Sequence, residues 1–182
     1  KVQVNSTRLI ANNVLNREID IAVVGGDIPN ELKKNLRIKD FVEDELSLII
    51  SKSHPFAKKK KIKKENLYYL NFITLNSNST IRKFIDKILI QNGIETKELK
   101  IIMQFNSIEG IKTAVSLGLG AAFVSSSAIE KEVELKTIEI LKIENIRITR
   151  SLSIISNPES YQSKAFELFY HELDTLKASI EN

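Results

Sequence analysis

The sequence predicts an α/β fold of two lobes with mainly parallel sheets. Short apolar runs typical of buried strands are each followed by a longer segment with apolar residues every three or four positions, which is typical of an amphipathic helix. This alternation occurs twice along the 182 residues. The strand-like segments 44–51 and 148–156 join the two sets. We therefore expect the chain to cross between the lobes twice.

The first set begins with the alternating segment KVQVN, which predicts a strand over residues 1–5. A helix is expected over 6–18, with Ile10, Val14 and Leu15 on its inner face. The run IDIAVVGG, residues 19–26, is too apolar for a half-exposed strand and predicts a buried one. The first set therefore contains two strands with a helix between them.

The second set contains three expected strands, each separated from the next by a helix. The strands are 70–75, 98–105 and 119–125, and the helices are 79–91 and 107–118. The helix 79–91 has an apolar stripe at helical spacing, Ser79 or Asn78 as its expected cap, and Asn92 with Gly93 as its expected stop. Asn106 is the expected cap of the second helix, because Glu109 follows at the spacing of a capping box. A short helix through Val133 follows the last strand, with Ser126 or Ser127 as its expected cap.

A final amphipathic helix is expected after Pro158. Its predicted inner face includes Tyr161, Ala165, Leu168, Phe169 and Leu176. Because this helix follows the second crossing strand, we assign it to the first lobe. The predicted boundaries are 1–47 plus 150–182 for the first lobe and 53–146 for the second.

The composition excludes several classes of protein. There is no apolar run near 18 residues and no visible signal peptide, so we expect neither a membrane span nor export. With no cysteine, the chain has neither disulfides nor thiolate metal sites. The +4 charge is concentrated in KKKKIKK, residues 58–64, which either touches nucleic acid or forms a solvated loop. Because no aromatic residues are interleaved with these lysines, we predict an exposed loop.

Polar residues follow several of the expected strands. In α/β folds ligands bind at the carboxyl ends of strands, beside helix N-termini. The candidate binding residues at such ends are Asn5, Ser6, Thr7, Gly25, Asn78, Ser79, Thr80, Arg82 and Asn106. The segment NSNST, residues 76–80, is either a solvated loop with a helix cap or an anion site built on backbone N–H groups and hydroxyls.

No set of residues supports catalysis. The only histidines are His54, in an expected turn, and His171, in the last helix, and both are predicted to be structural or solvent-facing. Neither a nucleophile elbow nor a metal-binding HExxH pair occurs. We therefore expect a binding domain with no catalytic residues, no metal and no cofactor.

Three motifs resemble the effector-binding domain of LysR-type transcriptional regulators: NREIDIAVVGG, DELSLIISKSHPFA and SIEGIKTAVSLGLGAAFVS. The segments LNFITLNSNSTIRKFIDKIL and FNSIEGIKTAVSLGLGAAFVSSSAIEKE are similar to the branch that regulates RuBisCO operons in cyanobacteria and algal plastids. The resemblance implies two lobes like those of type 2 periplasmic-binding proteins, with a small effector between them. It also implies that Asn5–Thr7 in the first lobe, and Asn78–Thr80 with Arg82 in the second, contact that effector.

The resemblance carries further expectations about partners. The effector would be a sugar phosphate, a phosphoglycolate-like acid or NADPH, and the full-length protein a homodimer or tetramer in the plastid stroma or bacterial cytoplasm. DNA binding would belong to an N-terminal winged helix-turn-helix absent from these residues, and the first lobe is expected to be truncated at its N-terminus. The alternative is a periplasmic-type solute-binding protein of a transporter, which shares the two-lobe architecture but should carry an export signal.

Overall fold

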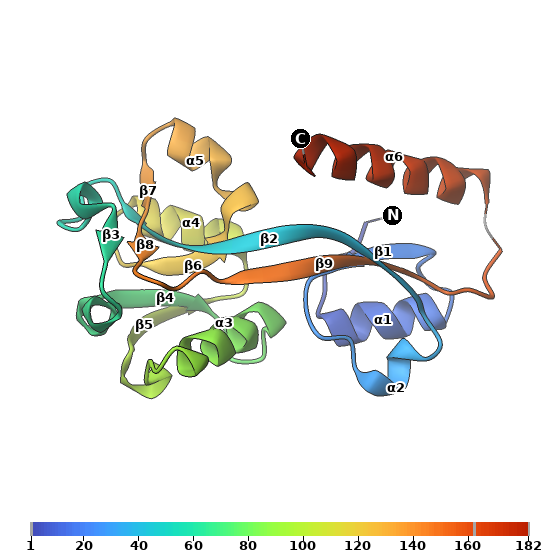
Figure 1. The fold of residues 1–182 in the computed structure, drawn as a ribbon, viewed down its shortest axis with the longest axis horizontal. Helices are drawn as coiled ribbons and strands as arrows, with labels where there is room; N and C mark the ends of the chain where they lie inside the picture. The colour runs from blue at the N-terminus through green and yellow to red at the C-terminus, as the bar shows by residue number, and fades with distance from the viewer. Residues whose placement is uncertain (1, 162, 182) are drawn as a thin grey trace. The chain divides into compact units, whose positions relative to one another are not determined.

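The computed structural model describes residues 2–161 and 163–181 and divides into two compact units (Figure 1). Unit 1 comprises Lys1–Glu43 and Arg150–Asn182, and unit 2 comprises Asp44–Thr149. The chain leaves unit 1 along β2 (Arg37–Ser51) and returns to it along β9 (Thr149–Ser156).

Unit 1 is built around an antiparallel pair of strands. β1 (Ile21–Val24) pairs with β9, with Ile21 opposite Ser156. The helix α1 (Thr7–Leu15) buries Ile10, Ala11 and Val14 in a core with Val24 and Ile155, as its apolar periodicity predicts. The remaining helices of this unit are α2 (Asn30–Lys33) and α6 (Lys164–Glu181).

Unit 2 combines parallel and antiparallel pairs. β2 pairs antiparallel with β6 (Ala122–Ser125) and with β7 (Ile138–Ile140). β4 (Asn71–Leu75) pairs parallel with β5 (Lys100–Phe105) through the crossover helix α3 (Thr80–Gln91). The other elements of unit 2 are β3 (Lys61–Ile62), which pairs parallel with β8 (Lys142–Ile143), the helices α4 (Ile108–Ser116) and α5 (Glu130–Glu134), and the 3-10 turns Ala57–Lys59, Lys64–Tyr69, Thr96–Glu98 and Ser126–Ala128.

The prediction of mainly parallel sheets is wrong. Among the described pairings, β1 with β9 and β2 with both β6 and β7 are antiparallel, and only β3 with β8 and β4 with β5 are parallel. A helical crossover makes its flanking strands parallel, as α3 does for β4 and β5. The long strands β2 and β9 instead pair with strands that run in the opposite direction.

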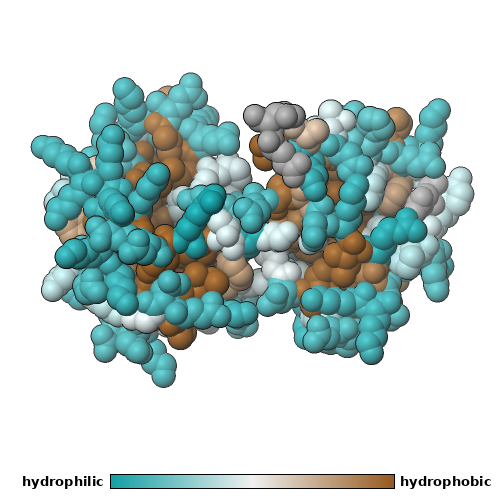
Figure 2. All heavy atoms as spheres, viewed as in Figure 1, coloured by the Kyte–Doolittle hydropathy of each residue, from teal (hydrophilic) through white to brown (hydrophobic). Residues whose placement is uncertain are grey.

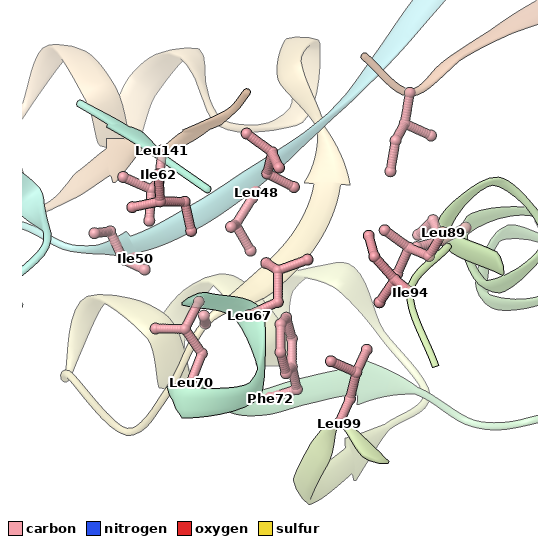
Figure 3. Close-up of a cluster of buried hydrophobic side chains, with 14 of the residues drawn as sticks. Leu48, Ile50, Ile62, Leu67, Leu70, Phe72, Leu89, Ile94, Leu99 and Leu141 are labelled. Atoms are coloured by element: carbon pink, nitrogen blue, oxygen red, sulfur yellow. The ribbon is translucent and has the colours of Figure 1, made fainter. Parts of the chain in front are cut away.

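Unit 2 has two buried apolar clusters, and the one in Figure 3 combines side chains of β2, β4 and α3. Ile85 and Leu89 of α3 are buried with Phe72 of β4, whose ring stacks on Phe123 at a centroid distance of 6.0 Å. At the C-terminus of α3, Gly93 adopts a φ of +74°, the left-handed conformation expected of a glycine after a helix. The apolar spacing and the stop signal therefore predicted this helix to within one residue.

The N-terminal segment is not the predicted strand. Residues 2–6 have no regular secondary structure, and the side chains of Val2 and Val4 are 92% and 91% exposed. A strand is stabilised by pairing and by burial of one face. Neither valine side chain is buried, so the alternating pattern does not produce a strand here.

The predicted inner face of the last helix is also wrong. Ala165 is exposed, and Tyr161, which precedes the helix, Leu168, Phe169 and Leu176 are between 49% and 88% exposed. Leu173 is buried instead, in a cluster with Phe41 and Ile154. On the same side of the helix, the Lys39 ammonium lies 2.7 Å from the Asp174 carboxylate and 4.8 Å from the centre of the Tyr170 ring.

The lysine run is exposed, as predicted, but it is not simply a loop. Figure 2 shows long hydrophilic side chains projecting from the part of unit 2 that carries β3. The run includes β3, whose Ile62 is buried, and Lys64, whose ammonium donates to the carbonyl of Asn92 at 3.1 Å. No helix of the described residues is long and apolar enough to cross a bilayer.

The resemblance implies that the full-length protein binds an operator. Replacing Lys58, Lys59, Lys61 and Lys63 by serine in that protein should then weaken binding to operator and random DNA alike, because exposed lysines contribute charge rather than base contacts. The affinity should also become less dependent on salt. Keeping Lys64 preserves its contact with Asn92. Fluorescence anisotropy over a salt series measures both quantities, and a collapse of discrimination between operator and random DNA would contradict the prediction.

An ion-pair cluster joins α4 to α5. The Lys112 ammonium lies 2.9 Å from a Glu109 carboxylate oxygen and 3.1 Å from one of Glu132, and it donates to the carbonyl of Ala128 at 2.9 Å. Partial burial acts to raise the pKa of Glu132. The hydrogen bond from Lys112 and backbone hydrogen bonds outweigh this, so the pKa lies below its ordinary value of 4.5.

This shift predicts a pH dependence of stability. Because the folded pKa of Glu132 is depressed, its contribution is fully present above pH 4.5 and is lost as the pH falls through the folded value. The difference in unfolding free energy between wild type and Glu132→Gln should therefore shrink as the pH is lowered from about 6 to below 4. Urea denaturation at several pH values measures it. A difference that stays constant would show that Glu132 gains nothing from ionisation in the folded state.

Candidate functional site

Three parallel strand ends meet at one edge of unit 2. Leu75 at the end of β4 is paired with Phe105 at the end of β5, and Phe72 forms a parallel bridge to Ala121, just before β6. The carboxyl ends of β4, β5 and β6 therefore lie side by side. Polar segments follow all three ends: 76–80, 106–107 and 125–127.

Asn76 organises the first two of these segments. Its side-chain amide donates to the Asn106 side chain at 2.8 Å, and its own oxygen accepts from the backbone N–H of Asn78 at 3.0 Å. The backbone N–H of Ser79 donates to the carbonyl of Asn76 at 3.0 Å. The loop before α3 is thus tied to the loop before α4. Asn76 was absent from the predicted site, although its place in the NSNST segment was the available signal.

Each of these two helices begins with a serine cap. Ser79 accepts from the backbone N–H of Arg82 at 3.4 Å, and Ser107 accepts from that of Gly110 at 3.2 Å. Asn106 is therefore not the cap of α4, because its amide is held by Asn76. The first-turn N–H groups of a helix have no partner within that helix, and the helix dipole adds positive potential there. Ser79 and Thr80 are half-buried at this position.

The Arg82 side chain pairs with Asp86, one turn further along the same helix. Its Nε lies 2.9 and 2.8 Å from the two carboxylate oxygens of Asp86, and its side chain is only 13% exposed. Because this edge of the guanidinium is occupied, Arg82 contributes first to the order of the α3 N-terminus. The charge-assisted contact stabilises the turn that carries Thr80.

The cavity beneath α3 is too small for a metabolite. It has a volume of about 30 Å³ and is lined by Phe72, Ile85, Leu89 and Phe123 together with the Arg82–Asp86 pair. This is about the space of one water molecule. The Thr74 hydroxyl, which also borders it, is buried and has no hydrogen-bond partner among the described residues. The strand-end loops, rather than this cavity, are the candidate site of unit 2.

The predicted residues of unit 1 have local structural roles. Ser6 caps α1 by accepting from the backbone N–H of Leu9 at 3.4 Å, Asn5 is exposed and Thr7 is buried. The carbonyl of Gly25 accepts from Arg150 at 2.9 Å, and a Cβ at this position would lie 2.5 Å from the Leu152 side chain. A larger residue at position 25 would therefore have to displace the Leu152 and Arg150 side chains.

A third polar group was missed. The Ser125 hydroxyl donates to the carboxylate of Asp44, which is only 7% exposed, and lies 2.8 Å from the Ser127 hydroxyl. The signal in the sequence was the run of three serines that ends the expected strand 119–125. It was interpreted only as a helix cap.

The histidines have structural environments. His54 Nδ1 accepts from the backbone N–H of Phe56 at 3.0 Å, and burial lowers the pKa of its imidazole. His171 is exposed and lies 3.4 Å from the Thr175 hydroxyl on the same helix. Within the described residues, no group of three potential metal ligands occurs.

The strand-end loops and capped helices are typical of a ligand-binding α/β domain. The family described as the LysR substrate binding domain matches residues 1–177. The chain belongs to this family, which comprises domains of transcriptional regulators and not enzymes. This confirms the resemblance and replaces the alternative of a transporter's solute-binding protein.

Similar proteins carry one description. The chain is 79% identical over 182 residues to a probable RuBisCO transcriptional regulator of Phaeodactylum tricornutum, covering all of this chain and 59% of that protein. It is 73% identical over 178 residues to one of Thalassiosira pseudonana, covering 97% of this chain and 58% of that protein. The chain therefore spans about three fifths of the length of these relatives.

Solved structures share the fold. The regulatory domain of CcmR from Synechocystis PCC6803, solved in complex with 2-PG, has a TM-score of 0.83 and 22% identity, covering 97% of this chain and 82% of that one. The effector-binding domain of QuiR, solved in complex with shikimate, has a TM-score of 0.77 and 19% identity, covering 96% and 79%. These likenesses show the α/β fold of LysR effector-binding domains.

Proposed function

We propose that this domain senses a small anionic metabolite and thereby controls carbon-fixation genes, including those of RuBisCO. The observation that carries the proposal is the joined pair of capped helix N-termini, α3 and α4, at neighbouring strand ends. Backbone N–H groups and hydroxyls there suit a phosphate or carboxylate. The similarity to probable RuBisCO regulators and the 2-PG complex of a protein with the same fold support it.

The proposed contacts in unit 2 are Ser79, Thr80, Asn78 and Asn106, with Arg82 adding positive charge. Asn5, Ser6, Thr7 and Gly25 of unit 1 remain predicted contacts of the same effector. The effector classes are a sugar phosphate, a phosphoglycolate-like acid and NADPH. An effector that binds one conformation better shifts the population toward it, and this shift changes how the full-length protein presents its DNA-binding domains.

The remaining parts of the proposal concern the full-length protein. It acts as a homodimer or tetramer in the plastid stroma or bacterial cytoplasm. It binds DNA through residues that are not among the 182 of this sequence. A thermal-shift screen followed by calorimetry tests the sensing role. The panel contains 2-phosphoglycolate, several sugar phosphates and NADPH, with glycerol as the uncharged control. We expect at least one anion to bind and glycerol not to bind. Binding of none of the anions would overturn the proposal.

A further inference from the structure

The missed polar group at the end of β6 has a fixed hydrogen-bond direction. An ionised carboxylate only accepts hydrogen bonds, and a serine hydroxyl has a single proton. Ser125 donates that proton to the buried carboxylate of Asp44. In the 2.8 Å contact between Ser125 and Ser127, Ser127 must therefore be the donor. The exposed Ser127 hydroxyl then has only acceptor lone pairs left for a ligand.

The neighbouring hydroxyl of Ser126 forms its hydrogen bonds within the protein instead. Its hydroxyl donates to the backbone carbonyl of Glu45 at 3.1 Å and lies 2.8 Å from the Ser47 hydroxyl. By the same reasoning Ser47 is the donor in that contact. The Ser126 hydroxyl is thus directed toward β2 and has its hydrogen bonds there. Ser127, in contrast, is the last member of the series of hydrogen bonds that begins at Asp44.

The register places this acceptor beside the anion site of unit 2. Phe72 forms an isolated parallel bridge to Ala121, so β6 starts next to β4. The loops that follow Leu75 and Ser125 therefore leave the same edge of unit 2. The loop 76–80 and the α3 N-terminus present donors, and the β6 end presents an acceptor.

We infer that the effector carries a hydroxyl group in addition to its anionic group, and that Ser127 accepts a hydrogen bond from that hydroxyl. The inference rests on the proposed function, because it describes the second end of the same binding site. It favours sugar phosphates, hydroxylated phosphate esters and the ribose of NADPH over phosphoglycolate, which has no hydroxyl to donate. Asp44 and Ser125 are positioning residues, because they fix the direction of the hydrogen bonds that lead to Ser127.

Calorimetry on the full-length protein with two matched pairs of probes tests the inference. The pairs are 3-phosphoglycerate with its 2-deoxy analogue, and glycerol 3-phosphate with propyl phosphate. Each pair keeps the anionic groups and differs only in hydroxyls. Because one neutral hydrogen bond separates the members at Ser127, the hydroxylated probe should bind roughly three- to tenfold more tightly.

Two variants assign the preference. Ser127→Ala should abolish it, while Ser126→Ala, which removes the neighbouring hydroxyl directed toward β2, should keep it. Equal affinities within each pair for the wild type, or a preference that survives Ser127→Ala, would overturn the inference and leave the anion site standing. Binding of neither member of either pair would overturn the inference, while the anion panel described above decides the anion site separately. Melting temperatures of both variants identify any loss caused by unfolding.

Discussion

Replacing Lys112 by methionine is expected to lower the free energy of unfolding by about 2–3 kcal/mol, because it leaves the Glu132 carboxylate without its partner. Methionine keeps most of the apolar stem, so the lost charge dominates. The side chains of Lys112 and Glu132 are only 11% and 20% exposed, and the other carboxylate oxygen of Glu132 is buried without a hydrogen-bond partner in the described structure. Residual solvent contact places the expected loss below that of a fully buried pair.

Glu109→Gln is the matched control, because Glu109 pairs with the same ammonium at 2.9 Å but is 80% exposed. An exposed pair of this kind contributes about 0.2–1 kcal/mol. The double variant Lys112→Met with Glu132→Leu should regain part of the loss, since no charge is then left buried. Urea denaturation of the four proteins measures these effects. Equal losses for Lys112→Met and Glu109→Gln would contradict the buried pair.

Thr80→Val is expected to weaken effector binding by about 1–2 kcal/mol, which is roughly five- to thirtyfold in the dissociation constant. Valine keeps the shape of threonine and removes one hydroxyl at the α3 N-terminus. The stability of the fold should change much less, because Ser79 still caps the helix through its contact with Arg82. Calorimetry with a metabolite that binds the wild type gives the two affinities.

Thr113→Val is the control for this result. Thr113 lies in α4, and its hydroxyl donates to the carbonyl of Glu109 within the same helix at 2.9 Å. Its loss removes a threonine hydroxyl from unit 2 without touching the strand-end loops. If Thr80→Val bound every metabolite as tightly as Thr113→Val and the wild type do, the NSNST segment would be a helix cap and nothing more.

The sequence predicted most reliably what depends on local periodicity and capping. The helix α3 has an apolar stripe, a serine cap and a glycine stop, and the structure shows all three. Strand direction was predicted less well, because it depends on which strands pair. An apolar run predicts a buried strand but not the direction of its partner. The antiparallel pairings of β2 with β6 and of β1 with β9 could therefore not be predicted from the apolar runs.

The errors in side-chain placement have a similar origin. The face of α6 that packs is set by contacts distant in sequence, such as Leu173 with Phe41 and Lys39 with Asp174, 135 residues away, and periodicity alone favoured the wrong face. In the candidate site, the polar residues after each strand were visible from sequence, but their contacts were not. The bond between Asn76 and Asn106, and the chain from Asp44 to Ser127, join residues that only the strand register brings together.

Hydrogen–deuterium exchange of the full-length protein, with and without a saturating metabolite from the panel, tests most directly whether the strand-end edge of unit 2 binds the effector. Ligand contact with the first turns of α3 and α4 should slow exchange in peptides that cover residues 76–83 and 106–111. Peptides over the exposed lysine run 58–64 serve as the internal control and should not change. Unchanged exchange in both strand-end peptides at saturation, with protection elsewhere in the domain, would contradict the account.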